Sequence, residues 1–388
     1  MNTVLKKVNK VYKEVNPSTY LSSINKKNIL RLEKQRRNLF HNKLNLPIEL
    51  FKNKKLLDLG SGTGMYSIIY NLWGADCTLV EYDKYSHEKA KIIFNKFQRK
   101  NSLNNFVKMD LFKFKNDLLY DIVHCNGVLH HTANKNKGIK IMADNLKKGG
   151  IFILGASIVT GFFQRNLQRL FLYKISKNKR EIIKNAKTYF GEHLNRAAKG
   201  SGRSVLAVIY DSYINSKIDS YSLKDLLKEL KKNKISFYSS FPNIINIKEN
   251  ELEWKFVNKN IISEMSLNFT NLIWFMRSKN ILYKKNKILF EIVLNLSKII
   301  NNISFDQKKK FEKKIIEMKK NLKLINDQSF TKSILFNSKA NIFFNEINKL
   351  LNIIENQDYL NVKKFKQNKF LFKGFSGLGM NYFVGFKS

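Results

Sequence analysis

The sequence predicts an α/β protein built on a doubly wound, mostly parallel sheet, and two observations lead to that prediction. Between residues 55 and 155, short apolar segments typical of strands alternate with longer segments of helical periodicity. The first of these strands runs into a turn with the sequence GSGTG at residues 60–64, and a helix start follows. A strand, a tight glycine turn and a helix in this order are typical of sheets that bind nucleotide-like ligands.

The individual elements are expected in a fixed order along the chain. Residues 20–45 indicate a helical segment, because leucines recur among many basic residues, and Pro47 marks its end. The expected strands are residues 55–59, 77–81, 106–109, 121–125 and 151–155, with a turn at 148–150 before the last one. The expected helices are residues 64–72, 86–100, 135–147 and 222–231, and residues 235–242 are expected to contain a further strand.

The charge balance of the chain permits two interpretations. The 388 residues carry a formal net charge of +41, and 43% of them are hydrophobic, which is enough for a sizeable core. A charge this high is typical of proteins that bind nucleic acid or anionic membranes. Here the excess is spread almost evenly over residues 1–150, 151–240 and 241–388, whereas a binding surface concentrates charge on one element. An even excess of Lys beside abundant Asn, Ile and Phe also fits a coding bias.

Cysteine use and hydropathy predict the compartment. Cys77 and Cys125 fall in or at the ends of expected strands, so the sequence indicates no disulfide framework, and a reducing compartment is expected. No apolar stretch of the signal-peptide kind follows residues 1–7. The longest apolar run, residues 151–163, is shorter than the ~20 residues that cross a bilayer. We therefore expect a cytoplasmic protein without a transmembrane segment.

Polar side chains follow the strands at the edge where ligands of such a sheet bind. Asp58 lies in the first strand, Asp110 closes the third, and Asn126 follows the fourth. Glu81 closes the second strand about 20 residues beyond the glycine turn, where a carboxylate commonly binds ribose hydroxyls. The glycine spacing is G-x-G-x-G, because Met65 stands where a dinucleotide fingerprint has its last glycine, and this disfavours NAD.

At these residues the sequence resembles the core of the class I S-adenosylmethionine-dependent methyltransferases, over residues 55–155. Residues 56–64 match the family's first motif, and residues 121–132 (DIVHCNGVLHHT) resemble the fourth-strand motif of a subgroup that carries G-V-L-H-H-T. Residues 146–150 are similar to the family's turn before strand five. The resemblance implies a Rossmann-like sheet of the class I methyltransferase type and S-adenosylmethionine as the cofactor. It implies that the cofactor is bound by Asp58, Gly60, Ser61, Gly62, Gly64, Glu81, Asp110 and Asn126.

The resemblance also implies a domain organisation with large helical insertions. An N-terminal helical segment, residues 1–50, precedes a core of residues 51–242 that contains a helical insertion at 159–208. Residues 376–388 carry the strand expected to complete the core sheet, at 381–387, so that residues 243–375 form a helical cap insertion. Apolar faces that begin with Ile288, Phe311 and Phe343, the second including Ile316, predict three helices there. We expect both insertions to shape the acceptor pocket.

Within the first insertion, basic and apolar residues are mixed over residues 162–180. The segment is interpreted either as a core-packed helix with a solvated face or as a contact for a membrane surface or RNA. Its basic residues are Arg165, Arg169, Lys174, Lys177, Lys179 and Arg180. Tyr210, Asp211 and Tyr213 follow the first insertion and are weaker candidates for contacts with the acceptor.

His130 and His131 are the candidate catalytic residues, because they follow strand four, where the acceptor should meet the methyl group. An imidazole titrates near neutral pH, so either residue is a candidate general base for an oxygen acceptor. The alternative is that they hydrogen-bond the loop or line the cofactor site. Cys125 is interpreted as a core residue and not a nucleophile, and the histidines lack the neighbouring ligands of a metal site.

The sequence thus predicts a methyltransferase that transfers a methyl group to a small or medium-sized metabolite, such as a sugar or a lipid-linked intermediate. An RNA methyltransferase that uses the basic surface is the first alternative. A non-catalytic, methyltransferase-like scaffold is the second.

Overall fold

The computed structural model describes residues 25–244, 262–277, 287–326, 338–359 and 380–388, together with residues 8, 10–11, 13–16, 361 and 371. The chain divides into two compact units, each assembled from separate stretches of sequence. The first unit comprises residues 1–156, 224–244 and 381–388. The second comprises residues 157–223 and 245–380.

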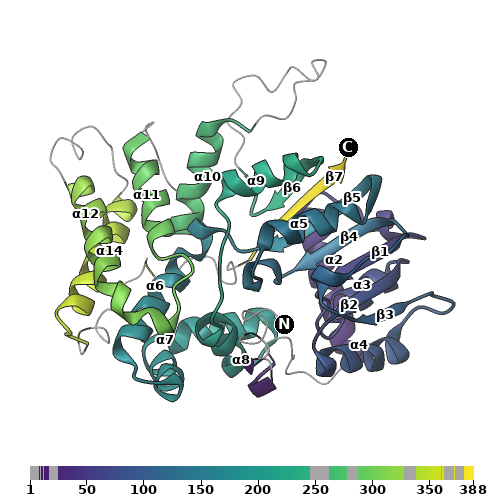
Figure 1. The fold of residues 1–388 in the computed structure, drawn as a ribbon, viewed down its shortest axis with the longest axis horizontal. Coiled ribbons are helices and arrows are strands. Elements are labelled where there is room, and N and C mark those ends of the chain that lie inside the picture. Colours follow the sequence, from purple (N-terminus) through teal and green to yellow (C-terminus); the bar gives the residue numbers. More distant parts are fainter. Residues whose placement is uncertain are drawn as a thin grey trace. The chain divides into compact units, whose positions relative to one another are not determined.

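In the described part of the chain, the first unit is built on a seven-stranded sheet of order β3-β2-β1-β4-β5-β7-β6. Strands β1 to β5 pair in parallel, and β7 pairs antiparallel with both β5 and β6. Figure 1 shows β7, in yellow, beside strands that come much earlier in the sequence. The predicted Rossmann-like fold class is confirmed. The strands are β1 (Lys55–Leu59), β2 (Asp76–Glu81), β3 (Asn105–Lys108), β4 (Tyr120–Asn126), β5 (Leu146–Ala156), β6 (Ile235–Phe241) and β7 (Asn381–Lys387).

Helices connect these strands, and side-chain caps fix where several of them begin. Asp83 accepts a hydrogen bond from the Ser86 N–H and thereby starts its helix two residues earlier than the sequence pattern predicts. Asn134 caps the helix after β4 by accepting from the Lys137 N–H. The helical elements of this unit are α2 (Lys26–Arg37), η1 (Asn38–Lys43), η2 (Ile48–Phe51), α3 (Ser67–Leu72), α4 (Lys84–Phe97), η3 (Leu111–Lys113), η4 (Leu129–His131), α5 (Lys135–Asp144) and α9 (Leu223–Lys232).

Two local predictions for this unit were wrong. The single helix expected over residues 20–45 is α2, which Asn25 caps, followed by the π-helical turn η1; residues 17–24 lie outside the described residues. The turn expected at residues 148–150 lies inside β5. The register with β4 shifts between Tyr120 and Ile122, and Gly149 adopts a φ of 72°. The expected turn is therefore an irregularity within β5, and glycine permits the positive φ that this irregularity needs.

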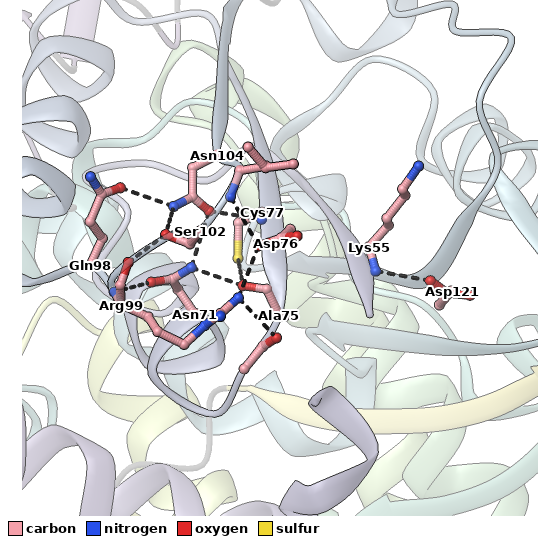
Figure 2. A network of polar contacts seen from close by, with 12 residues as sticks. Lys55, Asn71, Ala75, Asp76, Cys77, Gln98, Arg99, Ser102, Asn104 and Asp121 are labelled. Carbon is pink, nitrogen blue, oxygen red and sulfur yellow. Dashed lines mark hydrogen bonds and ion pairs between the residues drawn. The ribbon is translucent and has the colours of Figure 1, made fainter. Parts of the chain in front are cut away.

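A polar network joins the amino ends of the strands (Figure 2). The Asn104 side chain accepts from the Cys77 N–H at 2.9 Å and from the Asn71 amide at 3.2 Å. Arg99 pairs with Asp76 at 3.1 Å. Asp121 binds the Lys55 N–H at 2.9 Å, which ties β4 to β1. These contacts pair polar groups at the amino edge of the sheet, whereas ligands of such folds bind at the opposite, carboxyl edge.

The second unit is helical in its described residues, and its two stretches of sequence share one apolar core. Phe163 and Leu194 from the first stretch pack in the same cluster as Phe275, Val293 and Ile347 from the second. Figure 1 shows α11, α12 and α14 lying side by side. The elements are α6 (Val159–Ile175), α7 (Lys179–Ser201), α8 (Val205–Ile209), η5 (Tyr210–Ile214), α10 (Glu264–Met276), α11 (Lys287–Ile299), η6 (Phe305–Lys310), α12 (Phe311–Asn326) and α14 (Ser338–Glu355).

Three side chains of this unit differ from their predicted placement. Ile288 and Ile316 were assigned to buried faces, but they are 50% and 51% exposed, because the helices turn neighbouring apolar residues inward instead. The solvated face expected for residues 162–180 is absent from α6, whose residues are buried from Val159 to Tyr173. Arg165 is therefore buried along with the apolar residues of the helix. Among the described residues, no helix combines the length and apolar character that a membrane crossing requires.

Candidate active site

The glycine turn that follows β1 is packed tightly on its neighbours. The Gly60 N–H donates to the Val80 carbonyl at 2.8 Å, which fixes the turn beside the end of β2. A Cβ on Gly60 would lie 2.5 Å from Val128, and one on Gly64 would lie 3.0 Å from the Ala90 Cβ. Both glycines have a φ of 72°, a conformation that side chains disfavour. The turn thus holds its backbone in one shape immediately before α3.

Glu81 ends β2 with its carboxylate aimed at this turn. Oε2 accepts from the Gly62 N–H and Oε1 accepts from the Asp83 N–H, both at 2.8 Å. Burial raises the pKa of the Glu81 carboxyl to about 7, against the opposing effect of these two backbone hydrogen bonds. Each carboxylate oxygen has a second lone pair, so the group can still accept from a ligand hydroxyl.

Asp58 lies in β1, is 2% exposed, and makes hydrogen bonds with both carboxylate oxygens inside the protein. Oδ1 contacts His124 Nδ1 at 2.8 Å, and Oδ2 accepts from the Ser67 hydroxyl at the start of α3. Asp58 and His124 are register partners on the neighbouring strands β1 and β4. The carboxylate therefore ties β1, β4 and the first turn of α3 together directly beneath the glycine turn.

The contacts of His124 continue to the N-terminal helix. His124 Nδ1 contacts Asp58, and its Nε2 lies 3.1 Å from the Tyr70 hydroxyl. Arg36 of α2 donates to that same hydroxyl and, at 3.1 Å, to the Tyr382 hydroxyl of β7. Its guanidinium also lies 3.8 Å from the Tyr66 ring centroid. Arg36 thereby joins α2, α3 and β7.

Asp110 and Asn126 lie at the ends of β3 and β4. Asp110 caps η3, because its Oδ1 accepts from the Phe112 N–H at 3.0 Å. Asn126 extends toward β5, where a Cβ on Gly155 would come within 1.8 Å of the Asn126 Oδ1. Gly155 is thus required for the observed position of the Asn126 side chain.

Ser61 Oγ in the glycine turn and Asn126 Oδ1 at the end of β4 are buried oxygens of this edge that have no hydrogen-bond partner among the described residues. Strands β1 and β4 are neighbours, so both atoms belong to the same edge of the sheet. Buried polar atoms in native proteins are nearly always paired. Their presence beside Glu81 indicates a site for a polar ligand.

His130 and His131 form the short helical turn η4 after β4. Both are buried, 3% and 8% exposed, and their ring centroids lie 4.2 Å apart at an angle of 49°. The turn is fixed by packing on α5, since a Cβ on Gly138 would lie 2.4 Å from Leu129 Cδ2. The histidine pair follows the same strand as Asn126 and is held in a defined conformation.

The other residues singled out by sequence are either buried in strands of the first unit or belong to the second unit. Cys77 and Cys125 are buried in β2 and β4, and burial raises the pKa of both thiols well above the usual value. Tyr210, Asp211 and Tyr213 belong to η5 of the second unit, where Asp211 pairs with Arg203 at 3.0 Å. No group of three or more His, Cys, Asp or Glu side chains arranged to hold a metal occurs among the described residues.

Sequence reasoning missed the four partners of the Asp58 network: Ser67, Tyr70, His124 and Arg36. One signal was available for His124. It is the one basic residue in the apolar strand IVHC, and Asp58 is the one acidic residue in the apolar strand LLDL, so a pair between neighbouring strands accounts for both. Arg36 gave no such signal, because it is one of several basic residues in α2.

Comparison with known proteins supports the interpretation of this edge. A family model described as a methyltransferase domain matches residues 31–206. A ubiquinone biosynthesis O-methyltransferase of Rickettsia prowazekii is 29% identical over 155 residues, which are 34% of this chain and 60% of that protein. A protein of the same description from Rickettsia typhi is 28% identical over 155 residues, 34% of this chain and 61% of that protein. The chain thus spans about three fifths of the length of these relatives.

Solved structures give weaker likenesses. PKMT2 from Rickettsia typhi aligns with 54% of this chain and 43% of its own, at 16% identity and a TM-score of 0.40. Magnesium protoporphyrin IX methyltransferase from Synechocystis, solved with bound SAH, aligns with 62% of this chain and 87% of its own, at 15% identity and a TM-score of 0.35. TM-scores this low support no functional conclusion. The family match, however, spans the residues that hold the glycine turn, Glu81, Asn126 and both histidines.

Proposed function

We propose that this protein is an S-adenosylmethionine-dependent methyltransferase whose cofactor binds at the carboxyl edge of the sheet in the first unit. The observation that carries the proposal is the arrangement of Glu81. Its carboxylate faces the Gly62 N–H from the end of β2, in the place where dinucleotide and nucleoside sites hold a ribose diol. A ribose would supply two hydroxyl donors to a group that has acceptor capacity left.

The neighbouring residues fit the rest of such a ligand. The buried oxygens of Ser61 and Asn126 have no hydrogen-bond partner within the described part of the chain. Both can accept from the polar methionine and ribose groups, and Ser61 can also donate to them. Asp110 at the end of β3 is assigned to the adenosine side. Asp58 acts indirectly in this proposal, because its contacts with Ser67 and His124 hold the glycine turn in position.

S-adenosylmethionine, when bound, supplies a methyl group that its sulfonium has already activated. The chain then has to orient the acceptor, exclude water and, for a hydroxyl acceptor, take up a proton. His130 and His131 are the candidate bases for that proton, since they are buried beside each other after β4.

We propose a small or medium-sized metabolite with a hydroxyl group as the acceptor. The two curated relatives are described as ubiquinone biosynthesis O-methyltransferases, and transfer to oxygen is the case in which a histidine base is useful. Sugar hydroxyls and lipid-linked hydroxyls are the acceptor classes to try first.

Calorimetry with S-adenosylhomocysteine, the demethylated product, tests the cofactor site. We expect one site per chain in the wild type, with Glu81→Ala and Gly62→Asp each weakening binding at least tenfold. Glu88→Ala is the matched control, because Glu88 is an exposed acid on α4. This variant should bind S-adenosylhomocysteine with the same affinity as the wild type. A wild type that does not bind would overturn the proposal.

A second experiment separates the acceptor classes. The protein is incubated with methyl-labelled S-adenosylmethionine and either a metabolite extract or total RNA. Label in small molecules, lost in the double variant His130→Asn/His131→Asn while cofactor affinity is kept, supports the proposal. Label in RNA would favour the basic-surface alternative, and label in neither fraction would favour a scaffold.

A further inference from the structure

The second unit contains an arginine that is fully buried without a negatively charged partner. Arg169 of α6 is 0% exposed. Its Nη2 donates to two backbone carbonyls, of Ile303 at 2.7 Å and of Asn215 at 3.2 Å. Its Nε and Nη1 are buried and have no acceptor among the described residues. A guanidinium stays protonated in proteins, so this positive charge cannot be relieved by losing a proton.

Asn215, whose backbone carbonyl Arg169 contacts, also has an unpaired side-chain donor. Asn215 is 0% exposed, its Oδ1 accepts from the Lys217 N–H at 3.2 Å, and its Nδ2 has no acceptor among the described residues. Two residues in contact thus carry side-chain donors without an acceptor, and neither carries an unpaired side-chain acceptor. Unpaired hydrogen-bond donors are complementary to a ligand that has only hydrogen-bond acceptors. Carboxylate and phosphate groups are ligands of this kind.

A second buried arginine, Arg165, adds positive charge beside Arg169. Arg165 lies one helical turn before Arg169, so both project from one side of α6. It donates to the Tyr213 hydroxyl at 2.7 Å and lies against that ring, with Gln168 as its other partner, and all of these groups are neutral. Neither arginine forms an ion pair within the described residues, and α6 itself has no acidic residue.

Among the described residues, no acidic side chain forms an ion pair with the arginine. Tyr173 lies against the Arg169 guanidinium, 5.4 Å from ring centroid to the central carbon, and shares a side-chain hydrogen bond with it, while the Tyr173 hydroxyl donates to the Tyr213 carbonyl. Asp306 acts electrostatically on Tyr173 but makes no ion pair with Arg169. An uncompensated buried charge costs several kcal/mol, which a protein recovers when a counter-ion binds.

We propose that Arg169 and Asn215, with Arg165 adding positive charge, form an anion-binding site in the helical unit that takes a carboxylate or phosphate group. The site is independent of the cofactor proposal, because none of its residues belongs to the first unit. Its occupancy would stabilise the second unit by neutralising the buried cation.

Thermal unfolding of the full chain in the presence of small anions tests this site. Inorganic phosphate, pyrophosphate, malonate and citrate are compared with chloride at equal ionic strength. We expect a saturable rise in Tm of several degrees, since a ligand at a hundred times its Kd stabilises by about 2.7 kcal/mol. A rise with the phosphates alone assigns a phosphate ligand, and a rise with the dicarboxylate and tricarboxylate alone assigns a carboxylate.

Three variants make the test specific. Arg169→Gln should lose the anion response, whereas Arg180→Gln, at an exposed arginine that starts α7, should retain it. Asn215→Asp places a carboxylate beside the guanidinium, so it should raise Tm without added anion and abolish the response, which also covers the case that Arg169→Gln fails to fold. No saturable rise in the wild type, or an equal rise in Arg169→Gln or Asn215→Asp, would overturn the proposal.

Discussion

Glu81 is the residue whose protonation links the glycine turn to its ligand. Only the ionised carboxylate offers acceptors on both oxygens, and burial holds the pKa of the group near 7 in the free protein. Cofactor affinity should therefore fall as the pH drops below about 7 and level off above it. If only the ionised form binds, the decrease approaches tenfold per pH unit. Calorimetry with S-adenosylhomocysteine between pH 5.5 and 8.5 measures it.

The same pKa has an opposite effect on the free protein. The folded pKa of Glu81 lies above the ordinary value of 4.5, so between these two values the folded state holds more proton than the unfolded state. The contribution of this group to the free energy of unfolding consequently decreases as pH rises through that window.

Two variants control the binding experiment. Glu81→Gln should bind S-adenosylhomocysteine weakly at every pH, while the pH profile of Glu88→Gln should follow that of the wild type. A pH-independent affinity in the wild type would contradict the assignment.

At the scale of single elements, α2 is attached to the sheet by Arg36. Replacing it by Met removes two charge-assisted hydrogen bonds and leaves the hydroxyls of Tyr70 and Tyr382 without their donor. We expect a loss of about 3 kcal/mol, the lower end of the range for breaking a buried charged contact. Urea unfolding followed by far-UV circular dichroism measures it.

The next residue on the same helix provides the control. Arg37 is exposed and pairs only with Glu33 one turn away, at 2.6 Å. Arg37→Met should therefore cost about 0.5 kcal/mol or less. Equal losses for the two variants would show that Arg36 is not the attachment of α2.

The strands and helices of the first unit were largely predictable, because the glycine turn and the alternation of periods are local signals. β1 was predicted with its observed bounds, and Glu81, Asp110 and Asn126 all lie at strand ends as expected. What failed depends on distant partners. The buried arginines of α6 looked solvated, because the carbonyls that bind Arg169 lie 46 and 134 residues further along the chain. The Gly149 irregularity in β5 likewise depends on its pairing with β4.

At the scale of the whole molecule, each unit is discontinuous in sequence, and this predicts how destabilisation spreads. Val293 of α11 is fully buried in the core that α6 and α7 share with α10, α12 and α14. Val293→Asp buries an unpaired charge there and should release amide protection in α6 and α7, which lie 92 to 134 residues earlier in the chain. Protection of β1 to β5 should persist. Hydrogen exchange with mass spectrometry reads both units in one experiment.

Asn295→Asp supplies the control for that experiment, since residue 295 is exposed on the same helix. Like Val293→Asp, it adds one negative charge, but at the surface, so amide protection should be unchanged throughout both units. If α6 and α7 stay protected in Val293→Asp, the two stretches of the second unit do not share a cooperative core.

The position of β7 in the sheet has a consequence for synthesis. During translation, β1 to β6 are synthesised before β7, but β6 is joined to the rest of the sheet only through β7. Until residues 245–380 have been made and Asn381–Lys387 follows, β5 keeps an open edge and β6 stays without a partner. Open edges of this kind invite pairing with other chains. The sheet is thus exposed to misassembly for the whole time that the second part of the helical unit is being translated, and a chaperone that covers β5 would be most effective in that interval.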